Sequence, residues 1–237
     1  MKKNILFIGG STGIGLETIK LLHEKCNLIV ASRTNENLEN LDVKHLKFDV
    51  LNDELDLNEI PEILDGFVYC PGSINLRPFR GLKINTFQDD LNINFLSMVK
   101  ILQQVLNNLK KSECSSIVLY STVAVKIGMP FHSSISASKG AIEGFAKSLA
   151  AEFAPDIRVN VIAPSLTDTP LASRFLNNDL KKEKVGHRHP LKRHGKAIDI
   201  ANSTAFLLSE ESSWLTGQIL GVDGGLSTLN TSNWEII

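Results

Sequence analysis

The chain has 237 residues, a formal net charge of −1 and a hydrophobic content of 43%. This length suits a single α/β domain, and the hydrophobic content is sufficient for a large core. The small net charge argues against a general nucleic-acid binder, because such proteins usually carry a basic surface. Three scattered cysteines match no metal motif, and no apolar run is long enough to span a membrane. We therefore expect a soluble, cytoplasmic protein without a metal site.

Short apolar runs alternate with amphipathic helical patterns along the chain, which predicts βαβ units on a parallel sheet. The first part of the chain predicts strands at Asn4–Ile8, Leu28–Ser32, His45–Val50 and Gly66–Cys70, and a helix over Gly15–Lys25. The remainder predicts helices over Phe87–Leu109 and Ser134–Phe153, and strands at Ser116–Ser121, Arg158–Ala163 and Ile219–Val222. No linker or repeat interrupts this order. The sequence therefore predicts one Rossmann-type, doubly wound α/β domain over residues 1–237, with about seven strands flanked by helices.

The segment from Thr169 to Lys196 differs from the rest of the chain. It is polar, rich in Lys, Arg and His, and carries no strand signal. Its place after the sixth predicted strand indicates a mobile segment over the carboxyl end of the sheet, where open α/β folds bind ligands. We expect residues 169–196 to shape a substrate pocket.

A glycine-rich segment follows the first predicted strand and opens the first helix. It reads Gly9-Gly10-Ser11-Thr12-Gly13-Ile14-Gly15. In this context, glycines allow a tight turn and a close approach of backbone amides to a pyrophosphate, and the helix N-terminus attracts the anion. The segment predicts a dinucleotide site that uses Gly9, Ser11, Thr12, Gly13, Ile14 and Gly15.

The end of the second predicted strand bears on the choice of dinucleotide. NAD-binding proteins often carry an acidic residue there, whereas this chain has Ser32-Arg33-Thr34. A guanidinium pairs with phosphate through two hydrogen bonds, so the tripeptide favours the 2′-phosphate of NADP(H), although Arg33 is also compatible with a solvated loop charge. Asp49, followed by Val50, is placed to meet the adenine, and a turn or helix-capping role for Asp49 fits equally well.

Several segments resemble the classical short-chain dehydrogenase/reductase family, and the resemblance covers essentially the whole chain. The family's Thr-Gly-x-x-x-Gly-x-Gly is matched by Ile8–Gly15, with isoleucine in place of threonine. Arg158–Pro170 is close to the family's sixth strand and the loop after it, with Ser165 where glycine is usual. Ser212–Gln218 and Val222–Gly225 resemble the branch that includes 3-oxoacyl-carrier-protein reductases.

The resemblance implies further contacts to the cofactor and to other copies of the chain. Family members pair subunits through helices that correspond here to those around Phe87–Leu109 and Ser138–Phe153, which implies a homodimer or homotetramer. The cofactor contacts that the resemblance adds are Gly72, Lys139, Pro164, Thr167 and Thr169.

The resemblance weakens at the catalytic residues. In the family, a Tyr-x-x-x-Lys pair lies one helical turn apart, and a serine ends the preceding strand; the tyrosine gives a proton to the substrate carbonyl. Here Lys139 matches the lysine, Thr122 the serine and Asn94 the family's helix asparagine. Ile135 stands at the tyrosine position and has no proton to give. The resemblance thus implies an NADP(H)-dependent oxidoreductase for a carbonyl, hydroxyl or enoyl small molecule, with an altered proton donor.

Three interpretations of this difference stay open. His132 lies seven residues before Lys139, the Tyr–Lys spacing of enoyl reductases in this superfamily, although an ordinary loop histidine is the simpler interpretation. Water polarised by Thr122 and Lys139 is a second source of the proton, whereas Tyr120 lies inside a predicted strand and is expected in the core. Alternatively, the chain is a pseudoenzyme or partner subunit that holds a dinucleotide without turning it over.

Overall fold

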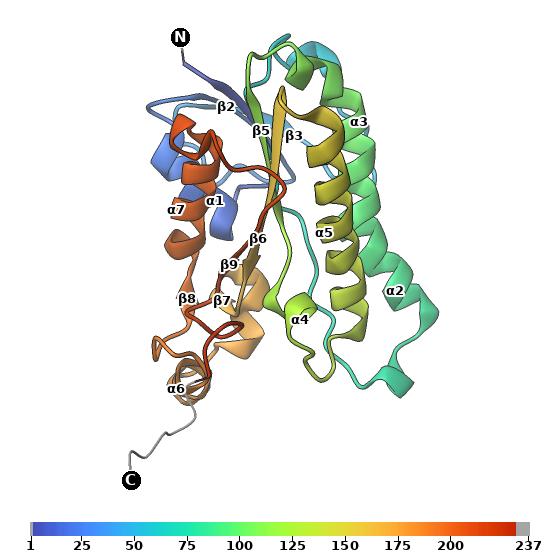
Figure 1. Ribbon diagram of the computed structural model, residues 1–237, viewed down its shortest axis with the longest axis vertical. Coiled ribbons are helices and arrows are strands. Elements are labelled where there is room, and N and C mark those ends of the chain that lie inside the picture. The colour runs from blue at the N-terminus through green and yellow to red at the C-terminus, as the bar shows by residue number, and fades with distance from the viewer. Residues whose placement is uncertain (1, 231–237) are drawn as a thin grey trace.

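A computed structural model describes residues 2–230, and its centre is a sheet of seven parallel strands (Figure 1). From one edge to the other, the order is β3 (Val43–Lys47), β2 (Asn27–Ser32), β1 (Asn4–Ile8), β4 (Gly66–Tyr69), β5 (Ser115–Tyr120), β6 (Ile157–Pro164) and β9 (Ile219–Val222). The chain winds outward in one direction from β1 to β3 and in the other from β4 onward. This is the doubly wound topology that the sequence predicted, with its switch point between β1 and β4.

Helices cover both faces of the sheet and make the molecule three layers thick (Figure 1). One face carries α1 (Gly13–Leu22) and α7 (Ala197–Leu208), and the other carries α3 (Ser97–Lys110) and α5 (Ser133–Phe153). The shorter elements are η1 (Leu57–Glu59), η2 (Phe79–Gly81), α2 (Ile84–Leu91), η3 (Asn92–Leu96), α4 (Val123–Lys126), β7 (Thr167–Asp168), η4 (Pro170–Phe175), α6 (Asp179–Arg188), β8 (Gly195–Lys196) and η5 (Glu210–Ser212).

The hydrophobic core lies on both faces of the sheet because successive side chains of a strand point in opposite directions. In β1, Ile5 and Phe7 pack in the cluster beneath α1 and α7, whereas Leu6 and Ile8 pack in the cluster beneath α3 and α5. All four side chains are almost fully buried. A strand that is apolar on both faces is typical of the centre of a parallel sheet.

The third strand and the first helix depart from their predicted bounds by more than one residue. The third strand ends at Lys47 rather than Val50, because the Asp49 carboxylate accepts hydrogen bonds from the backbone of Leu51 and the side chain of Asn52 and thereby closes a turn. The first helix begins at Gly13, two residues earlier than predicted, so the last two glycines of the glycine-rich segment lie in its first turn.

The long helix predicted over Phe87–Leu109 consists of three parts. Its ends are the α-helices α2 and α3, and the middle part, η3, is a π-helical turn. Wide turns of this kind are rare and frequently occur at functional sites. The turn contains Asn94, one of the predicted site residues.

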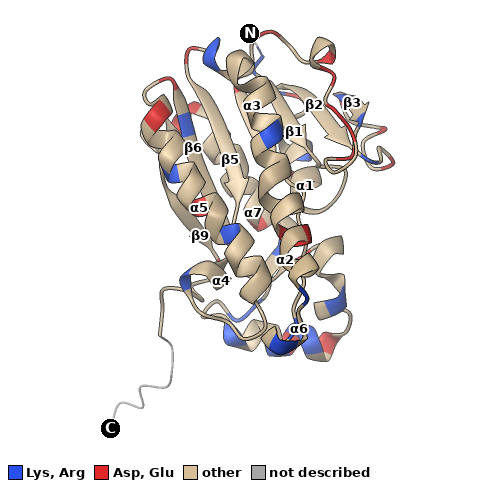
Figure 2. Ribbon diagram, turned by 90° about the vertical axis from the view of Figure 1, so that its right-hand side faces the viewer, with Lys and Arg blue, Asp and Glu red and all other residues tan. Residues whose placement is uncertain are grey.

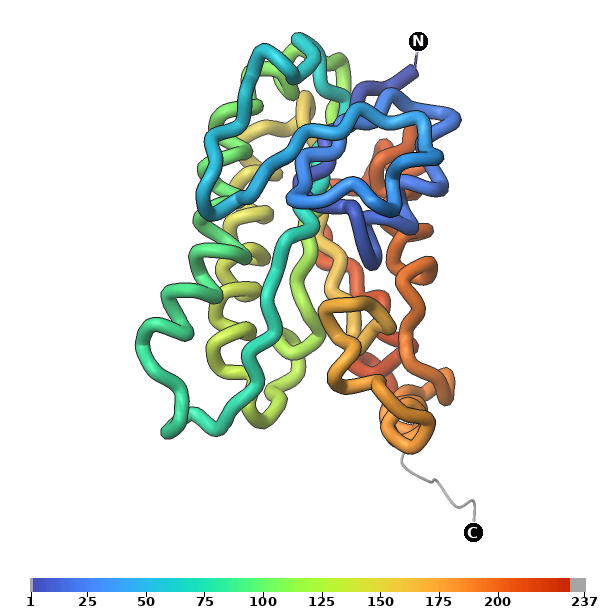
Figure 3. The backbone as a smooth tube through the Cα atoms, turned by 180° about the vertical axis from the view of Figure 1, so that it is seen from behind, coloured from blue at the N-terminus to red at the C-terminus, as the bar shows by residue number. Residues whose placement is uncertain are grey.

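Residues 169–196 contain regular structure that the sequence did not indicate. Most of the segment forms η4 and α6, and β8 at its end pairs with β7, so the expectation that it has no strand was wrong at Gly195–Lys196. Figures 1 and 3 place the segment at the carboxyl end of the strands. Figure 2 shows Lys and Arg positions in blue along α6, together with acidic positions in red.

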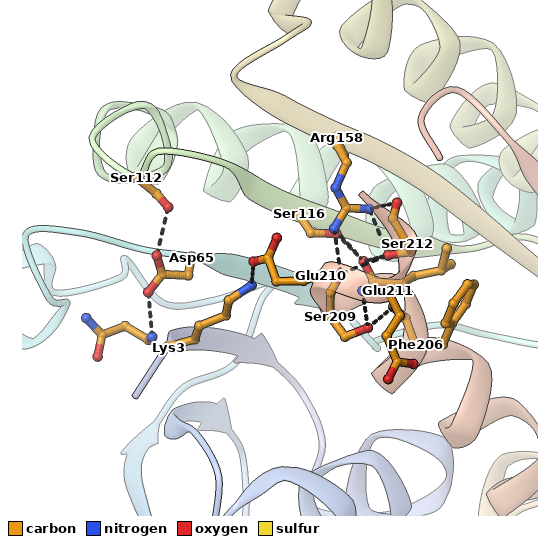
Figure 4. Close-up of polar contacts among 12 residues, drawn as sticks. Lys3, Asp65, Ser112, Ser116, Arg158, Phe206, Ser209, Glu210, Glu211 and Ser212 are labelled. Atoms are coloured by element: carbon orange, nitrogen blue, oxygen red, sulfur yellow. Dashed lines mark hydrogen bonds and ion pairs between the residues drawn. The ribbon is translucent and has the colours of Figure 1, made fainter. Parts of the chain in front are cut away.

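The opposite end of the sheet is fixed by a buried arginine (Figure 4). Arg158, at the start of β6, donates to the carbonyls of Leu207, Ser209 and Ser212 at 3.0, 3.2 and 2.9 Å. These carbonyls belong to the end of α7 and the turn after it, so the guanidinium ties this helix to the sheet. Among residues 2–230, no helix is long and apolar enough to cross a membrane.

Candidate active site

A cavity of about 640 Å³ opens at the carboxyl end of the sheet. Its walls come from the glycine-rich segment, the residues that follow β4, β5 and β6, the start of α5, and residues 169–189. Open α/β sheets bind ligands at this edge, beside the switch point. The loops after the two strands at the switch point run to opposite faces of the sheet, and a crevice is left between them. The predicted residues that line it are Thr12, Gly13, Ile14, Gly15, Gly72, Thr122, His132, Lys139, Pro164, Thr167 and Thr169.

The glycine-rich segment has the geometry of an anion cradle. Gly9 and Gly13 have φ angles of 77° and 61°, which side chains rarely adopt. A Cβ added at Gly15 would lie 2.6 Å from the Cα of Gly10, so the two backbone segments can pack only if the residue is glycine. Thr12 precedes α1 in an extended conformation, and its side chain makes no capping hydrogen bond to the first-turn amides. These residues fit a diphosphate at the helix N-terminus.

A second, smaller pocket lies beyond the ends of β2 and β3. In the register of this strand pair, Val30 lies opposite His45 and Ser32 opposite Lys47. His45 and Lys47 are two residues apart on one strand and therefore lie on the same face, which brings both beside the loop after β2. The pocket is lined by Arg33, Thr34, Asn35, Glu36, His45 and Lys47.

The sequence did not identify His45 or Lys47 as site residues. Their alternate positions along the third strand show that both side chains lie on one face of it. Their proximity to Arg33 depends on the pairing of this strand with the second strand. Ser32, which was predicted as a cofactor contact, is buried, and its hydroxyl donates to the carbonyl of Thr34 at 2.8 Å. Ser11 lies on the other side of Thr34, with 3.3 Å between their hydroxyl oxygens.

Asp49 and Val50 follow β3 instead of ending it. The Asp49 carboxylate accepts two hydrogen bonds within its own turn, at 3.0 Å from the Leu51 amide and 3.2 Å from the Asn52 side chain. The turn role that the sequence allowed for Asp49 is therefore present. A contact of either residue with adenine stays a prediction.

Lys139 lies at the floor of the cavity on α5. Its Nζ donates to the Tyr120 carbonyl at 3.0 Å, and a Cβ added at Gly72 would be 3.7 Å from Nζ. Burial lowers the pKa of Lys139 to about 8, while the nearby Cys70 and Asp90 act in the opposite direction. The lysine is thus a cation held in a poorly solvated place, and a ligand with hydroxyl or anionic oxygens would stabilise it.

Asn94 belongs to a buried polar network behind Lys139. Its Nδ2 donates to the Ser73 hydroxyl and to the Asp90 carbonyl, each at 2.8 Å. The fully buried Asp90 carboxylate accepts from Ser73, from Asn75 at 2.7 Å and from Ser134 at 2.6 Å. The network ties the segment after β4 to α2 and α5. Apart from Asn94, no member of the network could be recognised from sequence, because the others are 15 to 44 residues from Asp90.

Thr122 and Ile135 face the same cavity. Thr122 follows β5, where its Oγ1 accepts a hydrogen bond of 3.3 Å from the Ala124 amide at the start of α4. Ile135 lies one turn before Lys139 on α5 and also lines the cavity. The Ile135 side chain therefore forms an apolar part of the cavity wall, one helical turn before Lys139.

His132 and Tyr120, the two other residues considered as proton donors, differ in their burial. His132 directly precedes α5, is half-buried, and has its Nδ1 2.7 Å from the Pro130 carbonyl oxygen. Tyr120 is buried, with its hydroxyl 2.8 Å from that of Thr204, and burial raises its pKa far above the usual range. The prediction that Tyr120 belongs to the core is confirmed.

The loop after β6 closes the cavity from the other side. Thr169 lies against the glycine-rich segment, since a Cβ added at Gly13 would be 3.5 Å from the Thr169 Cβ. The Thr167 hydroxyl donates to the Ser165 carbonyl at 3.0 Å. Ser165 in turn contacts His189, which sequence analysis did not single out, with 2.8 Å between the serine Oγ and the imidazole Nε2.

Comparison with known proteins identifies the family. Residues 10–227 match the family model described as Enoyl-(Acyl carrier protein) reductase. The chain is 32% identical over 243 residues to the 3-oxoacyl-(acyl-carrier-protein) reductase FabG of Thermotoga maritima, covering 94% of this chain and 97% of that protein. It is 31% identical over 241 residues to the uncharacterized oxidoreductase YmfI of Bacillus subtilis, covering 95% and 99%.

Solved structures agree with these matches. The aldohexose dehydrogenase of Thermoplasma acidophilum superposes with a TM-score of 0.88 at 27% identity, covering 98% of this chain and 96% of that one. ElxO with NADP bound superposes with a TM-score of 0.87 at 26% identity, covering 97% and 100%. The fold and the site are those of a family of nicotinamide-dinucleotide oxidoreductases. The chain belongs to the short-chain dehydrogenase/reductase family.

Proposed function

We propose that the protein is an NADP(H)-dependent oxidoreductase that acts on a carbonyl, hydroxyl or enoyl group of a small, largely apolar molecule, with a proton donor other than tyrosine. The observation that carries this proposal is the meeting of Lys139, Thr122 and the anion cradle at one cavity. When bound, the cofactor supplies or accepts a hydride. The residues of this chain bind it, orient the substrate and move a proton.

The pocket beyond β2 and β3 supports NADP(H) as the cofactor. Arg33 and Lys47 are cationic and His45 adds an imidazole ring, whereas Glu36 is the single acidic residue among those that line the pocket. A 2′-phosphate would be held by charge-assisted hydrogen bonds from these groups. A variant of ElxO in which a tyrosine is replaced by phenylalanine has been solved with NADPH bound, and it superposes on this chain with a TM-score of 0.87.

The remaining predicted contacts follow from the course of the chain around the cavity. Gly9, Ser11 and Gly13 would receive the diphosphate, and Lys139 the ribose hydroxyls. Asp49 and Val50 would meet the adenine. The nicotinamide end would lie among Gly72, Pro164, Thr167 and Thr169.

The substrate would enter beneath residues 169–196. The cavity wall from this segment is mostly apolar, with Leu171, Phe175 and Val185, and its basic residues are Arg188 and His189. An acyl chain or another apolar body would fit this wall, and a reactive carbonyl or enoyl group would be placed near Thr122. We also propose that the chain forms a homodimer or homotetramer and acts in the cytoplasm.

Ile135 supports an alternative function, in which the chain binds a dinucleotide without turning it over. We infer that this residue occupies the position of the family's tyrosine, so the usual proton donor is missing. His132 or a water molecule held by Thr122 and Lys139 could replace it. If neither does, the chain is a dinucleotide-binding pseudoenzyme or a partner subunit.

Binding and turnover measurements separate these functions. NADPH and NADH dissociation constants are measured by fluorescence titration for the wild type, Arg33→Ala and His45→Ala. The matched control is Lys44→Ala, which removes a cation from the same strand but from its opposite face, where Lys44 pairs with Glu59 at 2.6 Å. We expect the first two variants to weaken NADPH at least tenfold and to leave NADH unchanged. Equal affinity of the wild type for both cofactors would refute the choice of NADP(H).

Turnover is tested with acetoacetyl-CoA as a carbonyl probe and crotonyl-CoA as an enoyl probe. We expect NADPH oxidation with at least one of them, and we expect Lys139→Ala to abolish it. Tight NADPH binding without turnover on a broad panel of carbonyl and enoyl compounds would favour the pseudoenzyme instead.

A further inference from the structure

A serine–histidine pair lies in the wall of the cavity, outside the residues that the family resemblance assigns. His189 directly follows α6 as its C-cap and is 3% exposed, yet it lines the cavity together with Ser165. The imidazole Nε2 is 2.8 Å from the Ser165 Oγ, and the Nδ1 is 2.8 Å from the Val185 carbonyl oxygen. Ser165 stands where the family usually has glycine, so the hydroxyl is a departure of this chain.

The hydrogen bonds define the direction in which the pair can move a proton. A carbonyl oxygen only accepts, so the Nδ1 of His189 carries hydrogen and donates to Val185. In the neutral ring, Nε2 accepts the hydrogen of the Ser165 hydroxyl. In the protonated ring, Nε2–H donates to the Ser165 Oγ, and the serine hydrogen is then available to a group in the cavity.

The pair also lies at the right place along the sheet. Tyr120 of β5 is opposite Ile162 of β6, so Thr122 and Pro164 are each two residues further on. Adjacent strands are about 4.8 Å apart, so Ser165 begins the loop beside Thr122 on the next strand. Thr122 and Ser165 both line the cavity, so the serine hydroxyl comes to the space in front of Thr122 from the β6 side.

The charged groups around His189 are mixed. On its own helix, Arg188 is the preceding residue, and Lys192 follows with its amide bonded to the His189 carbonyl. On the segment packed against the ring, Asp223 precedes Gly224, where an added Cβ would lie 3.5 Å from His189 Cδ2. Asp168 and His194, at 3.9 Å from each other, flank the β7–β8 pair nearby.

We propose that Ser165 and His189 form the proton relay that replaces the family's tyrosine, with Ser165 as the group that touches the substrate and His189 as the proton store behind it. This inference rests on the proposed function as an oxidoreductase. It assigns a role to the serine substitution and to the one buried histidine in the cavity wall. His132 is the weaker candidate, because it is only half-buried and its ring contacts the Pro130 carbonyl of its own loop.

The relay balances for carbonyl reduction. The substrate carbon takes the hydride that the reduced nicotinamide cofactor supplies, and the electron pair of the C=O bond moves to the oxygen. That oxygen takes the proton of the Ser165 hydroxyl, and the serine Oγ takes the Nε2 proton of His189. The imidazole becomes neutral, and its Nδ1–H stays hydrogen-bonded to the Val185 carbonyl. Nε2 then regains a proton from solvent. Alcohol oxidation runs through the same steps in reverse.

The test compares Ser165→Gly, which restores the family's residue, and His189→Asn with the wild type. The matched control is His187→Asn, because His187 lies on the same helix with a 70% exposed side chain. The turnover number and KM are measured for NADPH oxidation with acetoacetyl-CoA, and NADPH dissociation constants are measured alongside. Ring-nitrogen NMR of ¹⁵N-histidine-labelled protein reports the His189 hydrogen bonds without any turnover.

We expect both variants to lower kcat at least 100-fold, the scale of a lost positioned acid, while NADPH affinity stays within twofold. His187→Asn should match the wild type. In Ser165→Gly, the Nε2 resonance of His189 should shift while the Nδ1 resonance does not. If His189→Asn does not fold, as judged by its thermal unfolding, Ser165→Gly decides the question alone.

Three outcomes would overturn the relay. If the wild type oxidises NADPH and Ser165→Gly keeps kcat within threefold, the relay is wrong and the proposed function stands. A rise in KM with unchanged kcat would make the pair a structural or binding element. A wild type that binds NADPH but oxidises it with neither acetoacetyl-CoA nor crotonyl-CoA would remove the relay together with the proposed turnover.

Discussion

Replacement of Lys139 by methionine tests the electrostatics of the cavity floor. Burial lowers the lysine pKa from 10.5 to about 8. At about 1.4 kcal/mol for each pH unit, the charged side chain costs the cofactor-free fold on the order of 3 kcal/mol at neutral pH. Methionine removes this cost but loses the hydrogen bond to the Tyr120 carbonyl, which contributes about 1 kcal/mol. We therefore expect cofactor-free Lys139→Met to be about 2 kcal/mol more stable than the wild type at pH 7.

The pH dependence gives this prediction a second, independent signature. Between pH 8 and 10.5 the unfolded chain holds the lysine proton and the folded chain does not, so the stability of the wild type rises with pH over this range. The advantage of Lys139→Met should consequently shrink by about 2 kcal/mol between pH 7 and pH 9.5. It should be close to zero at pH 9.5 and reverse above the unfolded pKa, where methionine still lacks the hydrogen bond to the Tyr120 carbonyl.

Urea unfolding of the cofactor-free proteins at both pH values measures this difference. Lys147→Met is the matched control, because Lys147 is exposed on the same helix, and it should change stability by less than about 0.5 kcal/mol. NADPH affinity should fall in Lys139→Met and stay unchanged in the control. A Lys139→Met protein that is no more stable than the wild type at pH 7, or whose advantage does not vary with pH, would refute the reasoning.

Three further substitutions test other parts of the structure. Gly15→Ala places a Cβ 2.6 Å from the Gly10 Cα, so NADPH affinity should fall at least tenfold and unfolding free energy by about 1–3 kcal/mol, by titration and urea unfolding. Ile135→Tyr adds a phenol one turn before Lys139, and kcat for NADPH oxidation should rise at least tenfold; no gain would show that the pocket itself has diverged. Arg158→Met leaves the carbonyls of α7 without their donor, and urea unfolding should show a loss of about 3 kcal/mol or more, with NADPH affinity retained.

The local features of this protein could be predicted from its sequence. Apolar runs separated by helical patterns fixed the class of fold, because they determine which elements form and how they alternate. The segment from Gly9 to Gly15 could be recognised because all its parts are adjacent in the chain. The buried place of Tyr120 followed from its position inside an apolar strand.

Contacts between distant segments were decided by the tertiary structure alone. His45 joins Arg33 only because β3 pairs with β2 in a particular register, and the sequence assigned the end of β3 incorrectly, because a turn around Asp49 competes with the strand. The buried Asp90 meets Ser134 across 44 residues, where α2 packs against α5.

The Ser165–His189 pair shows the same limit most clearly. Its members are 24 residues apart, and the histidine caps the C-terminus of a helix within a segment that was predicted to be mobile. The sequence could show that Ile135 has no proton to give, because that is a property of one side chain. Which group replaces the missing proton donor depends on how α6 folds back over the sheet. That arrangement is set by packing between segments that are distant in the chain, and neither segment's sequence shows which other segment it will contact.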